Sequence, residues 1–223
     1  MKHPVTVVSF LKQNIQNDYT HVIMLFIVMV IIFCIGLLVR RMTAETPSKT
    51  QGAFEGLIGY LYNLGESVMG KEGLVYMPLI FGIGFYVAVS NLLGLIPGFL
   101  PPTMNLNTTA APAVCVFLFY QYIGIRKHGV RYIKHFLGPM PVLAPLMFLI
   151  ELVGHFARPL SLTMRLFGNI TGEEIVIVIL FTLVPFLVPL PMYLLAAFTG
   201  LLQAFVFMLL TMVYISGALE EAH

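Results

Sequence analysis

The residues of this sequence that are best suited to chemistry form a line of polar side chains inside a long apolar stretch, Met140 to Leu183. At about 100° per residue, most of them share one helix face about 80° wide, which we call the polar stripe. The stripe consists of Glu151, His155, Arg158, Arg165, Asn169 and Glu173, while Ser161 falls just off it and Glu174 falls on another face. An arginine at the centre of a membrane helix costs about 2.5–3.5 kcal/mol on insertion scales, so ionisable residues in such a helix indicate a functional site.

Arg165 lacks a charged neighbour within the polar stripe. No carboxylate stands three or four residues away from it, and Asn169, four residues on, can solvate the guanidinium but cannot neutralise it. The pattern therefore predicts a cation that meets a carboxylate from another chain. A solvated helix face is excluded by the apolar flanks MPVLAPLMFLI and IVIVILFTLV, whereas a structural seam of ion pairs stays open as an alternative.

The composition indicates that these residues lie in a membrane protein. Of the 223 residues, 59% are apolar and only 10% are charged, and the mean hydropathy is +0.93. A soluble domain carries about a quarter charged residues, so this chain cannot coat a globular surface. A net charge of +2 gives no sign of a nucleic-acid surface, and Cys34 and Cys115 have no metal-ligand spacing.

The uncharged runs predict an all-α integral membrane protein with five membrane segments and one amphipathic helix on the cytoplasmic side. A first span is expected at 22–39, an interfacial amphipathic helix at 51–72 and a transmembrane hairpin at 74–125, with a proline-rich turn at 97–109. The last two segments, 140–217, are expected to form a long helical hairpin with a turn at 184–191. A helix over 140–183 would be about 65 Å long, so it must be steeply tilted or lie partly outside the bilayer core.

The distribution of lysine and arginine predicts the orientation. Neither proline turn contains one, whereas four fall in each of two other connecting regions, namely Arg40, Arg41, Lys49 and Lys71, and Arg126, Lys127, Arg131 and Lys134. The positive-inside rule places these basic regions in the cytoplasm. Residues 1–21 are then outside the cell and the C-terminus is cytoplasmic.

Gln203 is a polar residue in the last helix, and it predicts either a hydrogen bond between helices or a position lining an aqueous path.

Two other classes of function fit the polar stripe less well. A secondary ion transporter would show inverted repeats and unwound half-helices, and neither is evident. An intramembrane enzyme would need a nucleophile with a base or a histidine metal pair, and the histidine spacing offers no such pair. A structural membrane subunit remains a further alternative.

The segments RPLSLTMRLFGNITGEE (158–174) and LLQAFVFMLLTMVYISGALEE (201–221) closely resemble the subunit a family of F-type ATP synthases, in a bacterial form. The resemblance extends from about residue 20 to the end of the chain, and the Arg-Leu-Phe-Gly-Asn run is its most diagnostic part. It implies a stator subunit of the membrane motor that is not catalytic alone and needs no cofactor or metal. The implied partners are the c-ring, the peripheral-stalk subunit b, the rest of the synthase, membrane lipid and the transported proton, in a bacterial plasma membrane.

The resemblance also implies roles for particular residues. Arg165 is the arginine that faces the carboxylates of the ring and separates two half-channels. The outer half-channel is implied near Asn169, Glu173, Glu174 and Gln203, and the cytoplasmic half-channel near Glu151, His155 and Ser161. The helical face favours Glu173 and the family pattern favours Glu174, so both remain candidates.

This sequence departs from the family pattern at three places. Asn105 stands in the outer loop where an aspartate is usual, Ala196 stands where some members have a histidine, and Glu173 is an extra carboxylate next to Glu174. The amide of Asn105 cannot exchange a proton at neutral pH, so Asn105 is not expected to serve in proton entry as an aspartate would.

Overall fold

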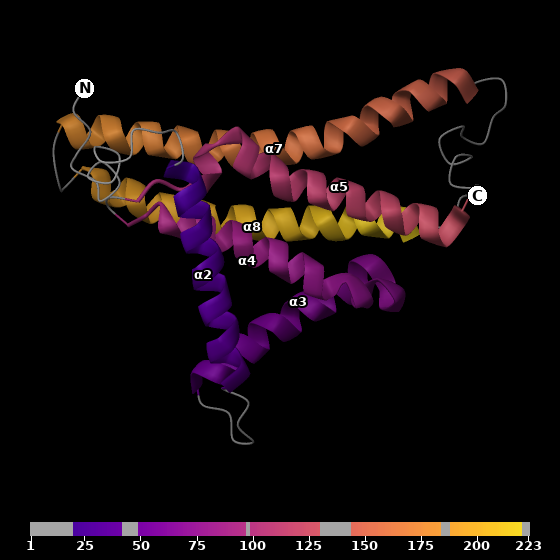
Figure 1. Cartoon of the computed structure of the whole chain (residues 1–223), viewed down its shortest axis with the longest axis horizontal. Helices are drawn as coiled ribbons and strands as arrows, with labels where there is room; N and C mark the ends of the chain where they lie inside the picture. Colours follow the sequence, from indigo (N-terminus) through magenta and orange to yellow (C-terminus); the bar gives the residue numbers. More distant parts are fainter. Residues whose placement is uncertain (1–19, 42–48, 97–98, 130–143, 184–187, 220–223) are drawn as a thin grey trace.

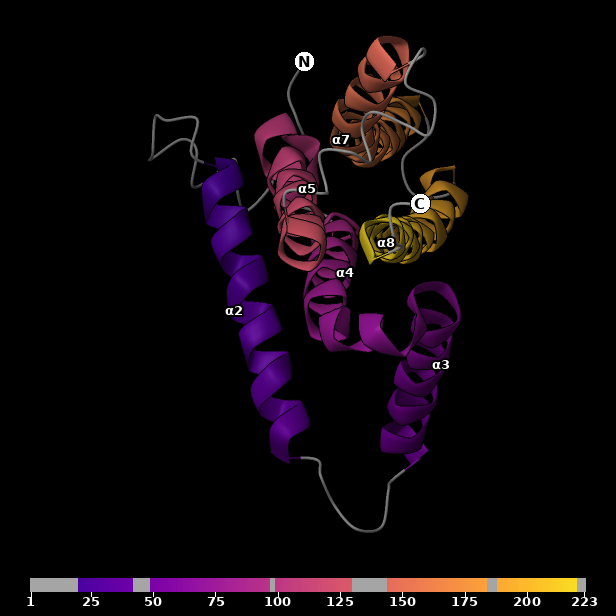
Figure 2. The same cartoon turned by 90° about the vertical axis from the view of Figure 1, so that its right-hand side faces the viewer.

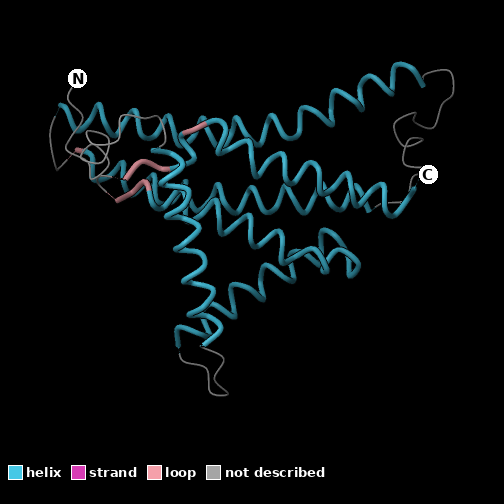
Figure 3. Tube along the Cα trace, viewed as in Figure 1, coloured by secondary structure: helices cyan, strands magenta, loops and turns pink. Residues whose placement is uncertain are grey.

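The computed structural model describes residues 20–41, 49–96, 99–129, 144–183 and 188–219. Nearly all of them are helical, and the described part contains no strand (Figure 3). Outside the described residues lie most of the expected N-terminal segment 1–21, the expected helix start at 140–143, residues 131 and 134 of the basic region and half of the turn 184–191.

The described chain forms six α-helices and two short 3-10 turns. In chain order they are α2 (Thr20–Arg41), α3 (Lys49–Gly73), η1 (Leu74–Tyr76), α4 (Met77–Leu93), η2 (Pro102–Met104), α5 (Leu106–His128), α7 (Ala144–Leu183) and α8 (Pro189–Leu219). Helix α5 begins within the stretch expected to be a turn because Asn105 caps it: the Asn105 side-chain oxygen accepts a hydrogen bond from the Asn107 amide at 2.9 Å. The observed role of Asn105 is therefore that of a helix cap.

Helices α4, α5, α7 and α8 lie alongside one another, while α2 crosses their direction (Figure 1). Viewed from the end, these four form a bundle flanked by α2 and α3 (Figure 2). Helix α8 contacts each of α3, α4, α5 and α7, so it is the centre of the packing. The main core is apolar and joins all four bundle helices, with Ile80, Val87, Val116, Leu166, Phe207 and Ile215 almost fully buried.

Small residues allow α4 and α8 to approach closely. A Cβ atom on Gly84 of α4 would lie 2.3 Å from Sδ of Met208, and one on Gly200 of α8 would lie 3.2 Å from Cβ of Asn91. Both distances are shorter than ordinary van der Waals contact. A side chain at either position would therefore force Met208 or Asn91 to shift.

Helix α3 divides into two parts. In its first half the apolar side chains of Phe54 and Leu57 are more than half exposed, whereas Leu61 and Met69 further along are buried. Gly70, with φ of 69°, interrupts the regular helical backbone before the chain continues into η1. The second half of α3 thus packs against the bundle, and the first half presents apolar surface outwards.

The expected class, an all-α membrane protein, is confirmed. Four helical stretches are long and apolar enough to cross a membrane, namely Phe54–Leu93, Leu106–His128, Leu146–Leu183 and Pro189–Leu219, and Val22–Leu37 is a shorter apolar stretch. Large apolar side chains cover the outside of these helices: Phe26 is 68% exposed and Leu194 is 76% exposed. A continuous apolar exterior of this kind matches lipid rather than water.

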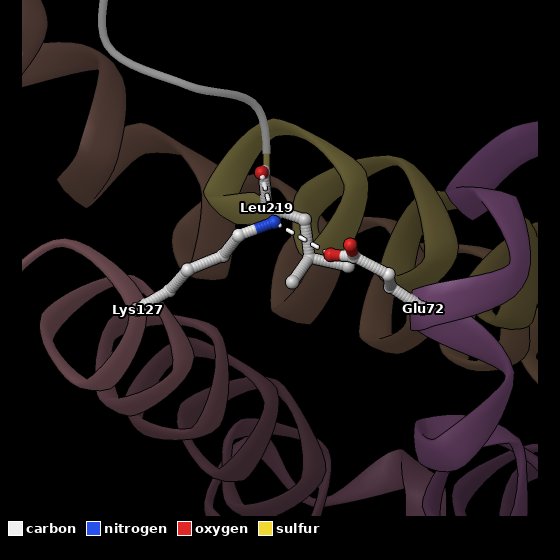
Figure 4. Close-up of polar contacts among 3 residues, drawn as sticks. All are labelled: Glu72, Lys127 and Leu219. Atoms are coloured by element: carbon white, nitrogen blue, oxygen red, sulfur yellow. Dashed lines mark hydrogen bonds and ion pairs between the residues drawn. The ribbon is translucent and has the colours of Figure 1, made fainter.

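Three helix ends meet at Lys127, in the last turn of α5 (Figure 4). Its Nζ atom donates to Oε2 of Glu72 at 2.7 Å and to the carbonyl of Leu219 at 3.0 Å. The Leu219 carbonyl lies at the C-terminus of α8, where the helix leaves carbonyls without partners and attracts a cation. Lys127 therefore ties α5 to the ends of α3 and α8.

We expect Lys127→Met to loosen the last turn of α8. A cation at a helix C-terminus contributes about 0.3–1 kcal/mol, so amide hydrogen exchange over residues 215–219 should become about 2- to 5-fold faster. The measurement is hydrogen exchange by mass spectrometry on the assembled protein. Arg126→Met is the matched control, since it removes the same charge from the neighbouring position. Equal exchange rates over residues 215–219 in both variants would contradict the role of Lys127 at the C-terminus of α8.

Candidate functional site

Helix α7 carries the whole polar stripe, and the structure separates its members by their surroundings. Arg165, Asn169 and Ser161 are exposed, His155 is buried, and Glu151, Arg158, Glu173 and Glu174 are half-buried. Helix α7 remains continuous through Pro159. The Thr163 hydroxyl donates back to the Pro159 carbonyl at 2.8 Å, the i−4 bond that threonine commonly makes inside a helix. A single helix thus holds both ends of the stripe.

The first cluster of the site joins α7 to α8. The Asn169 amide donates to Oε1 of Gln203 at 3.1 Å, and Gln203 is only 3% exposed. The hydrogen bond between helices expected for Gln203 is present in the structure. Within the described residues Nε2 of Gln203 has no hydrogen-bond partner, which leaves a buried donor beside Asn169.

Arg165 lies one helical turn before Asn169 on the same face. Its side chain is exposed, and no hydrogen bond or ion pair to its guanidinium occurs within the described part of the chain. The charge therefore projects from a surface otherwise rich in apolar side chains, such as Leu160 and Met164, which are 58% and 50% exposed. An unpaired cation on such an apolar surface is costly when it is removed from water, so an anionic partner would stabilise it.

The two adjacent carboxylates contact different residues of α8. Glu173 lies near Thr199, whereas Glu174 lies near Tyr193. Both carboxylates therefore lie next to the N-terminal half of α8, although they occupy different faces of α7. The arrangement keeps both as candidates for the outer path.

The second cluster lies in the N-terminal half of α7 and contains charges that are paired. Oε1 of Glu151 is 3.3 Å from Nδ1 of His155 and 3.8 Å from the guanidinium of Arg158. The same Nδ1 atom is 3.0 Å from the Glu151 carbonyl. A carbonyl can only accept, so this contact is a hydrogen bond in the tautomer that carries its hydrogen on Nδ1.

Two tyrosines complete this second cluster, and sequence reasoning did not find them. The Arg158 guanidinium lies over the rings of Tyr120 on α5 and Tyr214 on α8, at 5.8 Å and 5.5 Å from the ring centroids. The two rings are 5.9 Å apart, and the Tyr120 ring is also 5.9 Å from that of His155. These distances are typical of cation–π and aromatic pairs.

A buried polar bridge between α4 and α8 was also missed. The Asn91 amide donates to the Gly200 carbonyl at 3.1 Å, and the Thr103 hydroxyl donates to Oδ1 of Asn91 at 3.0 Å. The available signal was that Asn91 is an amide within an apolar helix, where a buried polar group needs a partner. The bridge joins α4 to α8 at Gly200, three residues before Gln203.

A structural seam of ion pairs accounts for only part of the stripe. Within the described residues the ion pairs of the stripe are confined to Glu151, His155 and Arg158, and none involves Arg165. A seam therefore describes one half of the stripe only.

A metal site was also considered for these residues. No group of three or more histidine, cysteine or acidic residues in the described part is arranged to hold a metal ion.

Comparison with known proteins shows which family this sequence matches. The family described as "ATP synthase A chain" matches residues 22–216. Over the full length of both chains, the sequence is 47% identical to ATP synthase subunit a of Geobacter sulfurreducens, 46% identical to that of Trichlorobacter lovleyi and 50% identical to ATP synthase subunit a 2 of Syntrophotalea carbinolica.

Proposed function

This chain belongs to the ATP synthase subunit a family, the non-catalytic, proton-translocating stator subunits of the membrane sector, and we propose that it conducts protons through two half-channels separated by Arg165. The observation that carries the proposal is the exposed and unpaired state of Arg165 among the described residues, next to the Asn169–Gln203 pair. We further propose that its anionic partner is a carboxylate on a rotating ring of c subunits, and that subunit b holds the chain in place. Each of these partners belongs to the same synthase.

Arg165 serves as a fixed charge and not as a proton carrier. A guanidinium stays protonated at all relevant pH values, so it cannot relay protons, and its charge repels protons that would leak between the half-channels. A carboxylate that faces lipid must be neutral because a bare charge there is very costly, whereas next to Arg165 it can be ionised. Protons therefore cross the membrane only when the ring carries them.

The outer half-channel is assigned to Asn169, Glu173, Glu174 and Gln203. The support is their common position between α7 and the first half of α8, together with the unsatisfied Nε2 donor of Gln203, which suits an ordered water. Carboxylates beside such water can pass protons towards the ring.

The cytoplasmic half-channel is assigned to Glu151, His155 and Ser161. His155 is a candidate relay because it is buried on α7 with Nδ1 only 3.3 Å from the carboxylate of Glu151, and imidazole exchanges protons near neutral pH. The positive-inside rule predicts the orientation of the chain in the membrane. In the predicted orientation, the Lys127 end of α5 and the C-terminus are cytoplasmic and the N-terminus is outside.

The test of this function is ATP-driven acidification of inverted membrane vesicles that contain the complete synthase, with the native chain or with the Arg165→Ala variant at equal subunit incorporation. Loss of acidification supports the stator role. Retained acidification would favour a structural membrane subunit that merely holds the ring.

We expect Gln203→Leu to slow proton pumping without preventing assembly. Leucine has a similar volume but leaves the Asn169 amide without its acceptor, and a lost hydrogen bond of this kind costs about 1–3 kcal/mol, or roughly 5- to 150-fold in an equilibrium. Because Asn169 is exposed, water can accept a hydrogen bond from its amide in place of Gln203. The decrease in the acidification rate should therefore be near the lower end of that range. Leu202→Gln on the same helix is the control for polarity alone. Failure of Gln203→Leu to incorporate would instead indicate a structural role.

A further inference from the structure

The polar stripe presents two arginines, and the proposed function uses only one. Arg158 and Arg165 are seven residues apart, which places them about 10 Å apart along α7 and on nearly the same face. A ring carboxylate that moves past α7 could pair with either cation. Two competing cations would give the carboxylate two resting positions and would blur the boundary between the half-channels.

The structure treats the two arginines differently. Arg158 is one-third exposed, and it is held by the faces of Tyr120 and Tyr214 and by the carboxylate of Glu151 at 3.8 Å. We call these three residues the Arg158 clamp. Arg165 has no comparable contact among the described residues.

The clamp is built on the rigid part of the bundle. Tyr120 is only 1% exposed, and its ring packs edge-on against Phe117 at 5.5 Å. The three clamp residues come from three helices, namely α5, α7 and α8, so their arrangement depends on the packed bundle. A guanidinium stacks on aromatic faces and still retains its full positive charge.

We propose that the Arg158 clamp sequesters a second cation, so that Arg165 alone meets the ring carboxylate. This inference rests on the proposed function and adds a positioning role for Tyr120, Tyr214 and Glu151. If the clamp opens, the long side chain of Arg158 can extend from α7 and hold the ring carboxylate at the wrong place. Opening the clamp therefore slows the motor because it adds an interaction, not only because it removes one.

The test is to open the clamp at Tyr214, which is only half-buried, and then to remove the released cation. Tyr214→Leu deletes one ring, and loss of one cation–π contact of about 0.5–2 kcal/mol raises the released population of Arg158 by roughly 2- to 30-fold. We expect the rate of ATP-driven acidification in inverted vesicles to fall, by at most that factor, because only the released fraction of Arg158 can hold the ring carboxylate. Tyr214→Phe, which keeps the ring face, should pump at the native rate.

The decisive variant is the double substitution Tyr214→Leu with Arg158→Gln. If the slow rate is caused by a released cation, the double variant should recover to the rate of Arg158→Gln alone. If Tyr214 has only a packing role, the double variant will be as slow as Tyr214→Leu or slower, and the clamp proposal is overturned. If Tyr214→Leu does not incorporate into the synthase, the same comparison is made with Tyr214→Met, which also lacks a ring.

The Arg165→Ala variant in the same assay separates failure of this inference from failure of the proposed function. Loss of pumping in Arg165→Ala without rescue in the double variant overturns the clamp alone. Normal pumping in Arg165→Ala overturns the proposed function itself. Loss of pumping in Arg158→Gln as complete as that in Arg165→Ala would also overturn the clamp, since Arg158 would then be an essential cation.

Discussion

Replacing Arg165 with alanine is expected to abolish ATP-driven proton pumping while the subunit still folds and assembles. The side chain is exposed and makes no hydrogen bond or ion pair within the described chain, so its removal should leave the bundle intact. In the assembled motor, removal leaves the ring carboxylate without its counter-charge in a site of low polarity. Breaking such a pair costs about 3–5 kcal/mol, so the acidification rate of inverted vesicles should fall by at least about 100-fold.

Two further variants test whether the charge or its geometry matters. Arg165→Lys keeps the charge but loses the planar donor fork, and it should also fail to pump. Arg126→Ala is the matched control, because it removes an exposed arginine from the last turn of α5, away from the polar stripe, and it should pump normally. Normal pumping by Arg165→Ala at full incorporation would refute the assigned role.

The second large effect is expected from replacing Glu173 and Glu174 together with glutamine. The double variant keeps the shape and polarity of both side chains but removes the carboxylates from the outer half-channel. Proton transfer by a positioned group typically contributes about 10²- to 10⁴-fold, and water in the path can replace part of it, so we expect acidification to slow at least about tenfold. ATP-driven acidification and ATP synthesis should decline together, because both use the same path.

The two single variants decide between the adjacent carboxylates. The one that lines the path should reproduce most of the double effect, and the other should behave like the native chain. Glu66→Gln on α3 is the control, since it removes an exposed carboxylate outside the stripe. A double variant that pumps at the native rate would exclude both residues from the path.

The class of the protein and the position of the long helix that carries the polar stripe could be predicted from the sequence because both depend on local properties. A charged fraction of 10% excludes a water-exposed surface, and an uncharged run of sufficient length requires a helix in lipid. The polar stripe follows from helical periodicity alone, since residues three and four apart share a face whatever surrounds them. For the same reason, the spacing of the charged residues is enough to show that Arg165 lacks a partner within its own helix.

The partners of the stripe could not be predicted from the residues alone. Asn169 and Gln203 are 34 positions apart, and Tyr120 and Tyr214 come from helices before and after α7. Periodicity defines which face of a helix is polar, but it does not define which neighbouring helix covers each part of that face. That choice depends on side-chain packing, including the close approach of α4 and α8 at Gly84 and Gly200.

The sequence by itself therefore determined a helical membrane protein with a charged stripe on one long helix. Only the tertiary structure decided that the two arginines of the stripe differ. Arg158 is enclosed by aromatic rings and a carboxylate, whereas Arg165 is left exposed. The physical reason is that the charge and the helical face of a residue are local properties, while the availability of its charge depends on the side chains that other helices place against it.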